Sequence, residues 1–169
     1  YLELGVNMKI EEIRKIKIKN LDNLSAYRKT LYEKPILHDL FLEVTSRCNA
    51  RCEHCGSSCG YEIPDYEISA DEIKKVLLSV AQKYDAKKIL LNVTGGEPLM
   101  RKDLFAIMDY ANNLGYPWGM TTNGMLINDE IIKNMIATNM KTISISLDGL
   151  KETHEYFRQG PNSFDKIIT

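Results

Sequence analysis

The sequence has almost no net charge, few cysteines and no long apolar run. It contains 22 Lys and Arg residues and 23 Asp and Glu residues, which gives a formal net charge of −1. A chain without an excess of positive charge lacks the basic surface that is typical of a protein that binds nucleic acid. No apolar run approaches the roughly 20 residues that span a bilayer, so we expect no membrane contact. The 44% of hydrophobic residues instead suits a globular domain with its own core.

The four cysteines lie close together, between positions 48 and 59. Such clustering does not suit a disulfide framework, and it indicates a reducing, cytoplasmic location. Cys48, Cys52 and Cys55 follow a C-x3-C-x2-C pattern directly after the apolar run 40–44. Thiolates ligate iron–sulfur clusters, and a cubane cluster has four irons. Three cysteines therefore leave one iron open to bind and activate a small molecule.

Two other interpretations of the cysteines need a fourth ligand. A structural zinc site would recruit His54 or Cys59, but zinc knuckles place two ligand pairs apart in sequence, and no distant second pair exists here. A closed, ferredoxin-like cluster would recruit Cys59. We favour the three-cysteine cluster, with Cys59 as a free thiol beside it.

The C-x3-C-x2-C motif resembles the cluster motif of the radical S-adenosylmethionine (radical SAM) superfamily. The resemblance implies a [4Fe–4S] cluster held by Cys48, Cys52 and Cys55, whose fourth iron chelates the methionine moiety of S-adenosylmethionine. It also implies reductive cleavage to a 5′-deoxyadenosyl radical, and hence an electron donor such as flavodoxin or ferredoxin. The resemblance covers residues 39–169.

From residue 39 onward, strand and helix patterns alternate, which indicates an α/β fold with a parallel sheet. We expect strands at 40–45, 88–94, 118–122 and 141–147. A capping box of Ser69 and Glu72 begins one helix. A complete eight-unit barrel needs about 250 residues, so this part holds about four βα units. Periodicity alone does not separate an open sheet from a barrel. The resemblance implies the partial parallel (β/α) barrel of the radical SAM type, truncated after about four units. The chain starts at Tyr1 and stops at Thr169, and we interpret it as a fragment.

Residues 1–38 form a separate lead-in in this interpretation. Ile16 and Ile18 alternate with lysines, which predicts a short strand. Asn20 then caps a predicted helix that ends at Pro35. The basic residues suit a solvated surface. The alternative, which the resemblance suggests, is a remnant of the peptide-binding module that precedes the catalytic domain in some peptide-modifying members.

Ligands of parallel α/β folds bind beyond the carboxyl ends of the strands, and the remaining motifs lie there. The turn Gly95-Gly96-Glu97 is similar to the family's Gly-Gly-Glu motif, which contacts the ammonium of the methionine moiety. The glycines permit close approach to a ligand, although a plain turn before Pro98 explains them too. Thr122 and Asn123 end the third predicted strand and are weaker candidates for cofactor contact.

The fourth predicted strand resembles the family segment that ends in Ser-x-Asp-Gly. Alternation along the strand places Ser144, Ser146 and Asp148 inside the barrel, where the last two could hydrogen-bond the cofactor's carboxylate and ribose. It directs the opposite side chains outward to pack under helices: Ile143, Ile145 and Leu147. A further helical segment is expected near Phe164.

Arg158 ends a segment that resembles the His-Asp-x-x-Arg motif of a subgroup with a C-terminal, cysteine-rich auxiliary-cluster domain, although Glu155 replaces the aspartate. The resemblance implies that Arg158 contacts the cofactor's carboxylate, which suits a guanidinium. A surface ion pair is the alternative. His54 stands where the family usually has an aromatic residue, so we expect it beside the adenine.

The sequence therefore predicts an enzyme: a radical SAM, maturase-like member that abstracts hydrogen from a peptide or protein. Two alternatives remain open. One is a radical SAM enzyme acting on a small molecule in cofactor biosynthesis. The other is a non-catalytic iron–sulfur or zinc module. No residue is assigned as a general base or other catalytic group.

Overall fold

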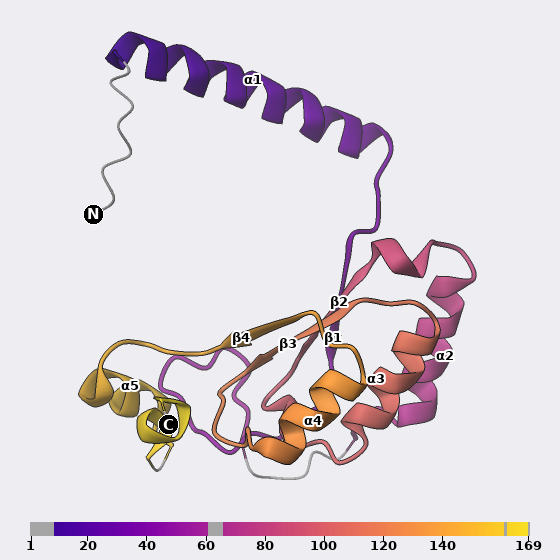
Figure 1. The fold of residues 1–169 in the computed structure, drawn as a ribbon, viewed down its shortest axis with the longest axis vertical. Helices are drawn as coiled ribbons and strands as arrows, with labels where there is room; N and C mark the ends of the chain where they lie inside the picture. Colours follow the sequence, from indigo (N-terminus) through magenta and orange to yellow (C-terminus); the bar gives the residue numbers. More distant parts are fainter. Residues whose placement is uncertain (1–8, 61–65, 161, 169) are drawn as a thin grey trace. The chain divides into compact units, whose positions relative to one another are not determined.

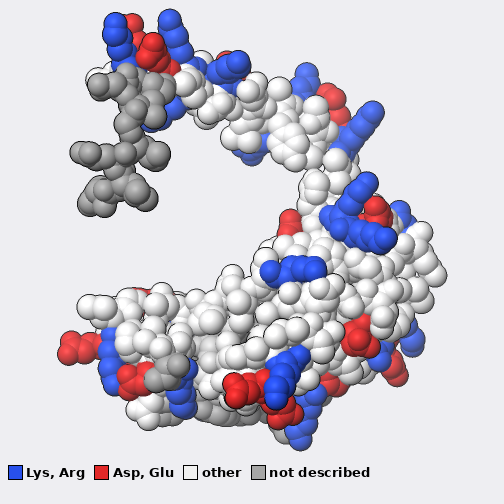
Figure 2. All heavy atoms as spheres, viewed as in Figure 1, with Lys and Arg blue, Asp and Glu red and all other residues white. Residues whose placement is uncertain are grey.

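The computed structural model describes residues 9–60, 66–160 and 162–168 and divides the chain into two compact units, residues 1–37 and 38–169 (Figure 1). Residues 1–8 of the predicted lead-in lie outside the described residues. Among the residues that the structure describes, no helix is both long and apolar enough to cross a bilayer. On the face drawn in Figure 2, Lys and Arg side chains are interspersed with Asp and Glu in both units.

The described part of the first unit is dominated by one helix, α1 (Ile10–Glu33). The predicted strand at Ile16 and Ile18 is therefore wrong, and Asn20 lies inside the helix rather than at its start. The alternation covers only a few residues, whereas apolar residues at helical spacing recur along the whole segment. A single strand without a partner would also leave its backbone N–H and C=O groups unpaired. No side chain of α1 is buried.

The second unit contains one parallel sheet of β1 (Asp39–Glu43), β2 (Leu90–Thr94), β3 (Trp118–Thr122) and β4 (Thr142–Ile145). The strands lie in the order β1-β2-β3-β4, so each pairs with its neighbour in sequence. A doubly wound sheet reverses its strand order at a switch point. The steady order fits a barrel wall, and it confirms the predicted α/β class with a parallel sheet.

Helices α2 (Ala70–Ala81), α3 (Leu104–Asn113) and α4 (Asp129–Ala137) connect the strands, together with the short 3₁₀ turns η1 (Ala86–Lys88) and η2 (Pro98–Met100). The predicted capping box is confirmed: the Ser69 hydroxyl accepts from the Glu72 N–H, and the Glu72 carboxylate accepts from the Ser69 N–H. Buried apolar side chains of α2 and α3 join those of β2 and β3 in the core: Ile73, Leu77, Leu91, Val93, Leu104, Ile107, Met108 and Trp118.

The prediction for the outer face of β4 is wrong in one respect. Ile143, Ile145 and Leu147 are 40%, 42% and 50% exposed, so helices do not bury them. In the described sheet, β4 pairs with β3 alone, and an edge strand lacks the helix cover that a strand inside the wall receives. Two short helices follow β4: α6 (Ser163–Ile168), near the predicted position, and α5 (Lys151–Arg158), which the sequence analysis missed.

Candidate functional site

A cavity of about 220 Å³ opens where the parallel strands end. The cysteine loop after β1 supplies one wall, the glycine turn after β2 and the end of β3 supply another, and the segment from β4 to α5 closes the side. Most of the predicted site residues line it: Cys48, Cys52, His54, Cys55, Gly95, Gly96, Thr122, Asn123, Ser146 and Arg158. Glu97 and Asp148 do not line it, and Cys59 does. The structure thus brings the predicted residues together, and their roles stay predictions.

The cysteine loop is fastened to its surroundings by backbone bonds and by packing. The Cys48 N–H donates to the Gly60 carbonyl at 2.7 Å, and the Cys55 N–H donates to the Cys52 carbonyl at 3.1 Å. Buried Cys48 packs with the other small apolar groups of the loop and with Met125 beyond β3. This packing orients the loop toward the carboxyl edge of the sheet.

The three motif cysteines line one cavity, where burial, backbone N–H groups and neighbouring charges act on the ionisation of Cys48 and Cys55. Burial raises the pKa of Cys48, and the charges of Glu97 and of the Cys52 and Cys55 thiolates raise it further. Backbone N–H groups that follow in the loop, at Cys59 first, lower the pKa of Cys55. A cationic iron cluster would offset the repulsion among three neighbouring thiolates.

The donor set fits an iron–sulfur cluster. All four cysteines are free thiols, and the three of the motif line one cavity. Within the described ranges, no group of three His, Cys, Asp or Glu side chains is close enough to hold a single ion. The thiols of a cluster bind different irons and stand farther apart than ligands of one tetrahedral zinc. Cys48, Cys52 and Cys55 line one cavity, as a cluster bound by three thiolates would require, and the choice between cluster and zinc stays a prediction.

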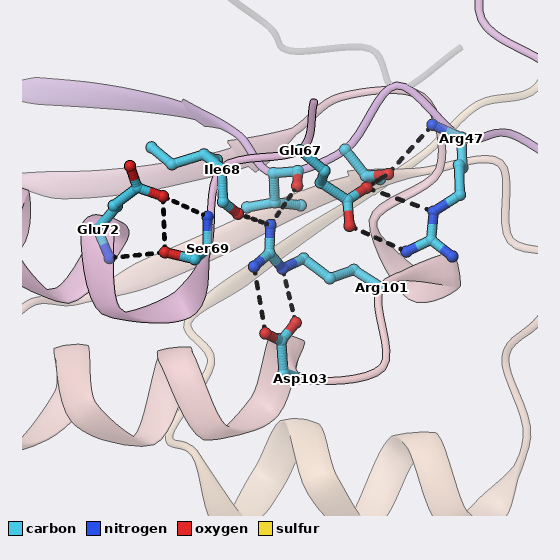
Figure 3. Close-up of polar contacts among 9 residues, drawn as sticks. Arg47, Glu67, Ile68, Ser69, Glu72, Arg101 and Asp103 are labelled. Carbon is cyan, nitrogen blue, oxygen red and sulfur yellow. Dashed lines mark hydrogen bonds and ion pairs between the residues drawn. The ribbon is translucent and has the colours of Figure 1, made fainter. Parts of the chain in front are cut away.

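Arg101 fastens the two ends of the cysteine loop to each other (Figure 3). Its side chain is 3% exposed, and one guanidinium nitrogen donates to the Val44 carbonyl at 2.6 Å and to the Ile68 carbonyl at 2.8 Å. The other nitrogens bind the Asp103 carboxylate at 2.7 and 3.2 Å. Val44 ends the approach to the loop and Ile68 ends its return, so Arg101 closes the loop at its base.

Glu67 reinforces the same closure (Figure 3). Its carboxylate accepts from the Thr45 hydroxyl at 2.5 Å and from the Arg47 guanidinium at 3.1 and 3.3 Å. Burial raises the pKa of Glu67, but the hydrogen bonds from Thr45 and Arg47 outweigh it and the pKa falls below its usual value. Neither Glu67 nor Arg101 was predicted from the sequence to be part of the site, because charged residues in loops usually lie in solvent.

The glycine turn approaches the chain's own backbone very closely. Gly95 has φ +142°, and a Cβ there would lie 2.4 Å from the Thr45 carbonyl oxygen. A Cβ on Gly96 would lie 2.3 Å from the Arg47 carbonyl oxygen. The Gly96 and Glu97 N–H groups donate to those two carbonyls at 2.7 and 2.8 Å. The glycines are therefore needed to pack the turn against the cysteine loop, in addition to lining the cavity.

The Glu97 carboxylate is directed at β3 rather than at the cavity. It is fully buried and accepts from the Thr122 hydroxyl at 2.7 Å, the Asn123 N–H at 2.8 Å and the Leu99 N–H at 3.1 Å. Burial raises its pKa, while these hydrogen bonds counteract the rise. Glu97 thus joins the ends of β2 and β3, and a role toward an ammonium stays a prediction.

Asp148 and Arg158 form an ion pair at the mouth of the cavity. The guanidinium binds the carboxylate at 2.5 and 3.0 Å, and the hydrogen bonds from Arg158 lower the pKa of Asp148. A further guanidinium nitrogen lies 3.9 Å from Cys52 Sγ. The Asp148 N–H donates to Nδ1 of buried His154 at 3.3 Å. Arg158 thus contacts the Asp148 carboxylate on one side and the cysteine loop on the other.

His54 lies beside the same ion pair. Its ring meets Phe157 edge to face at a centroid distance of 5.6 Å, and Nε2 lies 4.0 Å from the Asp148 carboxylate. The imidazole is about half exposed and lines the cavity. A planar group at this wall offers a surface for another ring.

Comparisons with known proteins agree with this geometry. The family model of the radical SAM superfamily matches residues 42–169. The AdoMet-dependent heme synthase of Methanosarcina barkeri is 35% identical over 127 residues, which cover 75% of this chain and 36% of that protein. Mycofactocin maturase MftC of Mycobacterium tuberculosis is 32% identical over 126 residues, which cover 75% and 31%. The chain belongs to the radical SAM superfamily, whose members use a [4Fe–4S] cluster and S-adenosylmethionine.

Solved structures share the fold. Native anSMEcpe with bound AdoMet superposes with a TM-score of 0.64 at 24% identity, over 79% of this chain and 39% of that one. Streptococcus suis SuiB bound to the precursor peptide SuiA gives a TM-score of 0.63 at 16% identity, over 95% and 35%. The chain spans about a third of the length of the curated relatives named above.

Proposed function

We propose that the protein containing this chain is a radical SAM enzyme that modifies a peptide or protein. The observation that supports the proposal most is the single cavity lined by the three motif cysteines, the glycine turn and Arg158. A [4Fe–4S] cluster bound by Cys48, Cys52 and Cys55 would supply the electron that cleaves S-adenosylmethionine to a 5′-deoxyadenosyl radical.

The chain's own residues would bind and orient the cofactor. Gly95 and Gly96 present backbone to the cavity, and Ser146 offers a hydroxyl. Arg158 is held by Asp148, so its remaining N–H groups are oriented for the cofactor's carboxylate. The His54 ring at the cavity wall would pack against the adenine.

Two observations support a peptide substrate. A curated relative at 32% identity is a mycofactocin maturase, and a structural neighbour carries a bound precursor peptide. In the same proposal, residues 1–38 belong to a lead-in that precedes the catalytic domain, as in some peptide-modifying members. An electron donor such as flavodoxin or ferredoxin reduces the cluster, and the reaction takes place in the cytoplasm, where clustered thiols stay reduced.

A small-molecule substrate is the second candidate, because the heme synthase relative at 35% identity is at least as similar as the maturase. The full-length protein would be purified, reconstituted without oxygen, and supplied with a reductant and S-adenosylmethionine. We expect 5′-deoxyadenosine from the wild type and none from Cys52→Ala. Mass spectrometry would then detect a change in peptides encoded beside the gene or in a porphyrin. No 5′-deoxyadenosine from a fully loaded wild type would refute the enzyme assignment.

A further inference from the structure

The side chain of Asn123 is held in one orientation from several directions. It follows β3 and is 8% exposed. Its Oδ1 accepts from the Met125 N–H at 3.0 Å, and the backbone N–H of Asn123 donates to the Glu97 carboxylate at 2.8 Å. Since only an oxygen can accept from Met125, the positions of the amide oxygen and nitrogen are fixed.

The amide nitrogen of Asn123 is consequently directed at the first part of the cysteine loop. It donates to Asn49 Oδ1 at 2.7 Å and lies 3.9 Å from Cys48 Sγ. An amide carries two hydrogens, so one N–H can serve each acceptor. Sulfur is larger than oxygen and its hydrogen bonds are longer, which accounts for the difference in distance. Asn123 thus directs an N–H dipole toward a predicted cluster ligand from outside the loop.

We propose that Asn123 is a positioning residue that raises the reduction potential of the cluster through its N–H···S contact with Cys48. The proposal rests on the proposed function, because it requires a cluster at the three cysteines. Reduction adds negative charge, which spreads onto the ligating sulfurs, and an N–H dipole aimed at a sulfur stabilises that state. Removing the donor should therefore make the cluster harder to reduce.

Arg158 is a second donor, 3.9 Å from Cys52 Sγ. The two residues differ in what else they can bind. Arg158 lines the cavity and is proposed to contact the cofactor, whereas the other hydrogen bonds of Asn123 go to protein groups that are buried or half-buried. The effect of Asn123 on the potential should therefore persist with and without S-adenosylmethionine.

The experiment is a redox titration of the full-length, anaerobically reconstituted protein, followed by electron paramagnetic resonance without added cofactor. The variants are Asn123→Ala and Asn123→Asp. Aspartate keeps the size of the side chain and an oxygen for Met125, but it removes the donor and adds negative charge. Thr121→Ala is the matched control, because Thr121 lies at the same strand end, lines the same cavity and is exposed.

At the wild-type midpoint, we expect the ratio of reduced to oxidised cluster in Asn123→Ala to fall by roughly threefold to tenfold, as for one lost hydrogen bond. The ratio should fall further in Asn123→Asp, and in Thr121→Ala it should equal the wild-type ratio. A loaded Asn123→Asp with the wild-type midpoint would overturn the proposal. Loss of the cluster from Asn123→Asp would do the same, because the residue would then be needed for binding rather than tuning. If the wild type itself held no cluster, the proposed function would fail first.

Discussion

Replacing Arg101 by methionine should destabilise the protein severely. Methionine keeps much of the length of the side chain but has no donor, so the buried Val44 carbonyl and the partly buried Ile68 carbonyl lose their partner. A buried acceptor without a partner costs about 1–3 kcal/mol. Asp103 is 45% exposed and can turn to solvent, so its loss adds little. We expect the free energy of unfolding to fall by about 2–5 kcal/mol, because two acceptors lose their partner at about 1–3 kcal/mol each and one of them is only partly buried.

Urea unfolding of the full-length protein, followed by circular dichroism, measures this change. Lys151→Ala is the control, since both side chains of the Lys151–Asp165 pair are about half exposed and solvent screens their attraction, so the variant should unfold like the wild type. In the wild type, the hydrogen bonds of Arg101 hold the two ends of the cysteine loop together. The iron content after reconstitution should therefore fall together with stability when they are lost. A cost below about 1 kcal/mol for Arg101→Met, with full iron content, would refute the closure of the loop by this residue.

Three further predictions concern the same region. Cys59→Ala should keep the cluster and Cys52→Ala should lose it, as counted by iron and sulfide analysis; the reverse result would refute the ligand assignment. Gly96→Val should unfold at a lower temperature and bind less iron, because its Cβ meets a backbone oxygen of the cysteine loop at 2.3 Å, whereas Gly56→Ala has open space and should be silent. Glu67 has a lowered pKa when folded, so its stabilisation is present above its unfolded pKa of about 4.3 and is lost as the pH falls through the folded value. The difference in unfolding free energy between wild type and Glu67→Gln should shrink along that acid limb, and a difference independent of pH would contradict the assignment.

Local patterns predicted the features that depend on neighbours in sequence. The capping box at Ser69 needs only a residue three positions on, and the strand ends were marked by glycines and by apolar runs. The parallel sheet and the gathering of the motifs at one edge followed from the alternation of strands and helices. These parts of the site could be predicted from the sequence because parallel strands place successive loops together.

Other features depended on contacts that no local pattern encodes. Arg101 is followed by Lys102 and resembles a surface residue, yet it is buried because two backbone carbonyls distant in sequence face it. The pairing of Asp148 with Arg158 required α5, which the sequence analysis missed. The two isoleucines in α1 show the converse problem, since a short alternation also satisfies a helical spacing.

The steady strand order has a consequence for how the protein is made. Each strand pairs with the one synthesised just before it, so the sheet can grow strand by strand in step with translation. The cavity cannot form step by step in the same way. Its cysteine loop leaves the ribosome early, whereas Ser146 and Arg158 emerge about a hundred residues later, as their numbers show. The nascent chain therefore carries exposed thiols while about a hundred further residues are synthesised, before the wall that shields them exists.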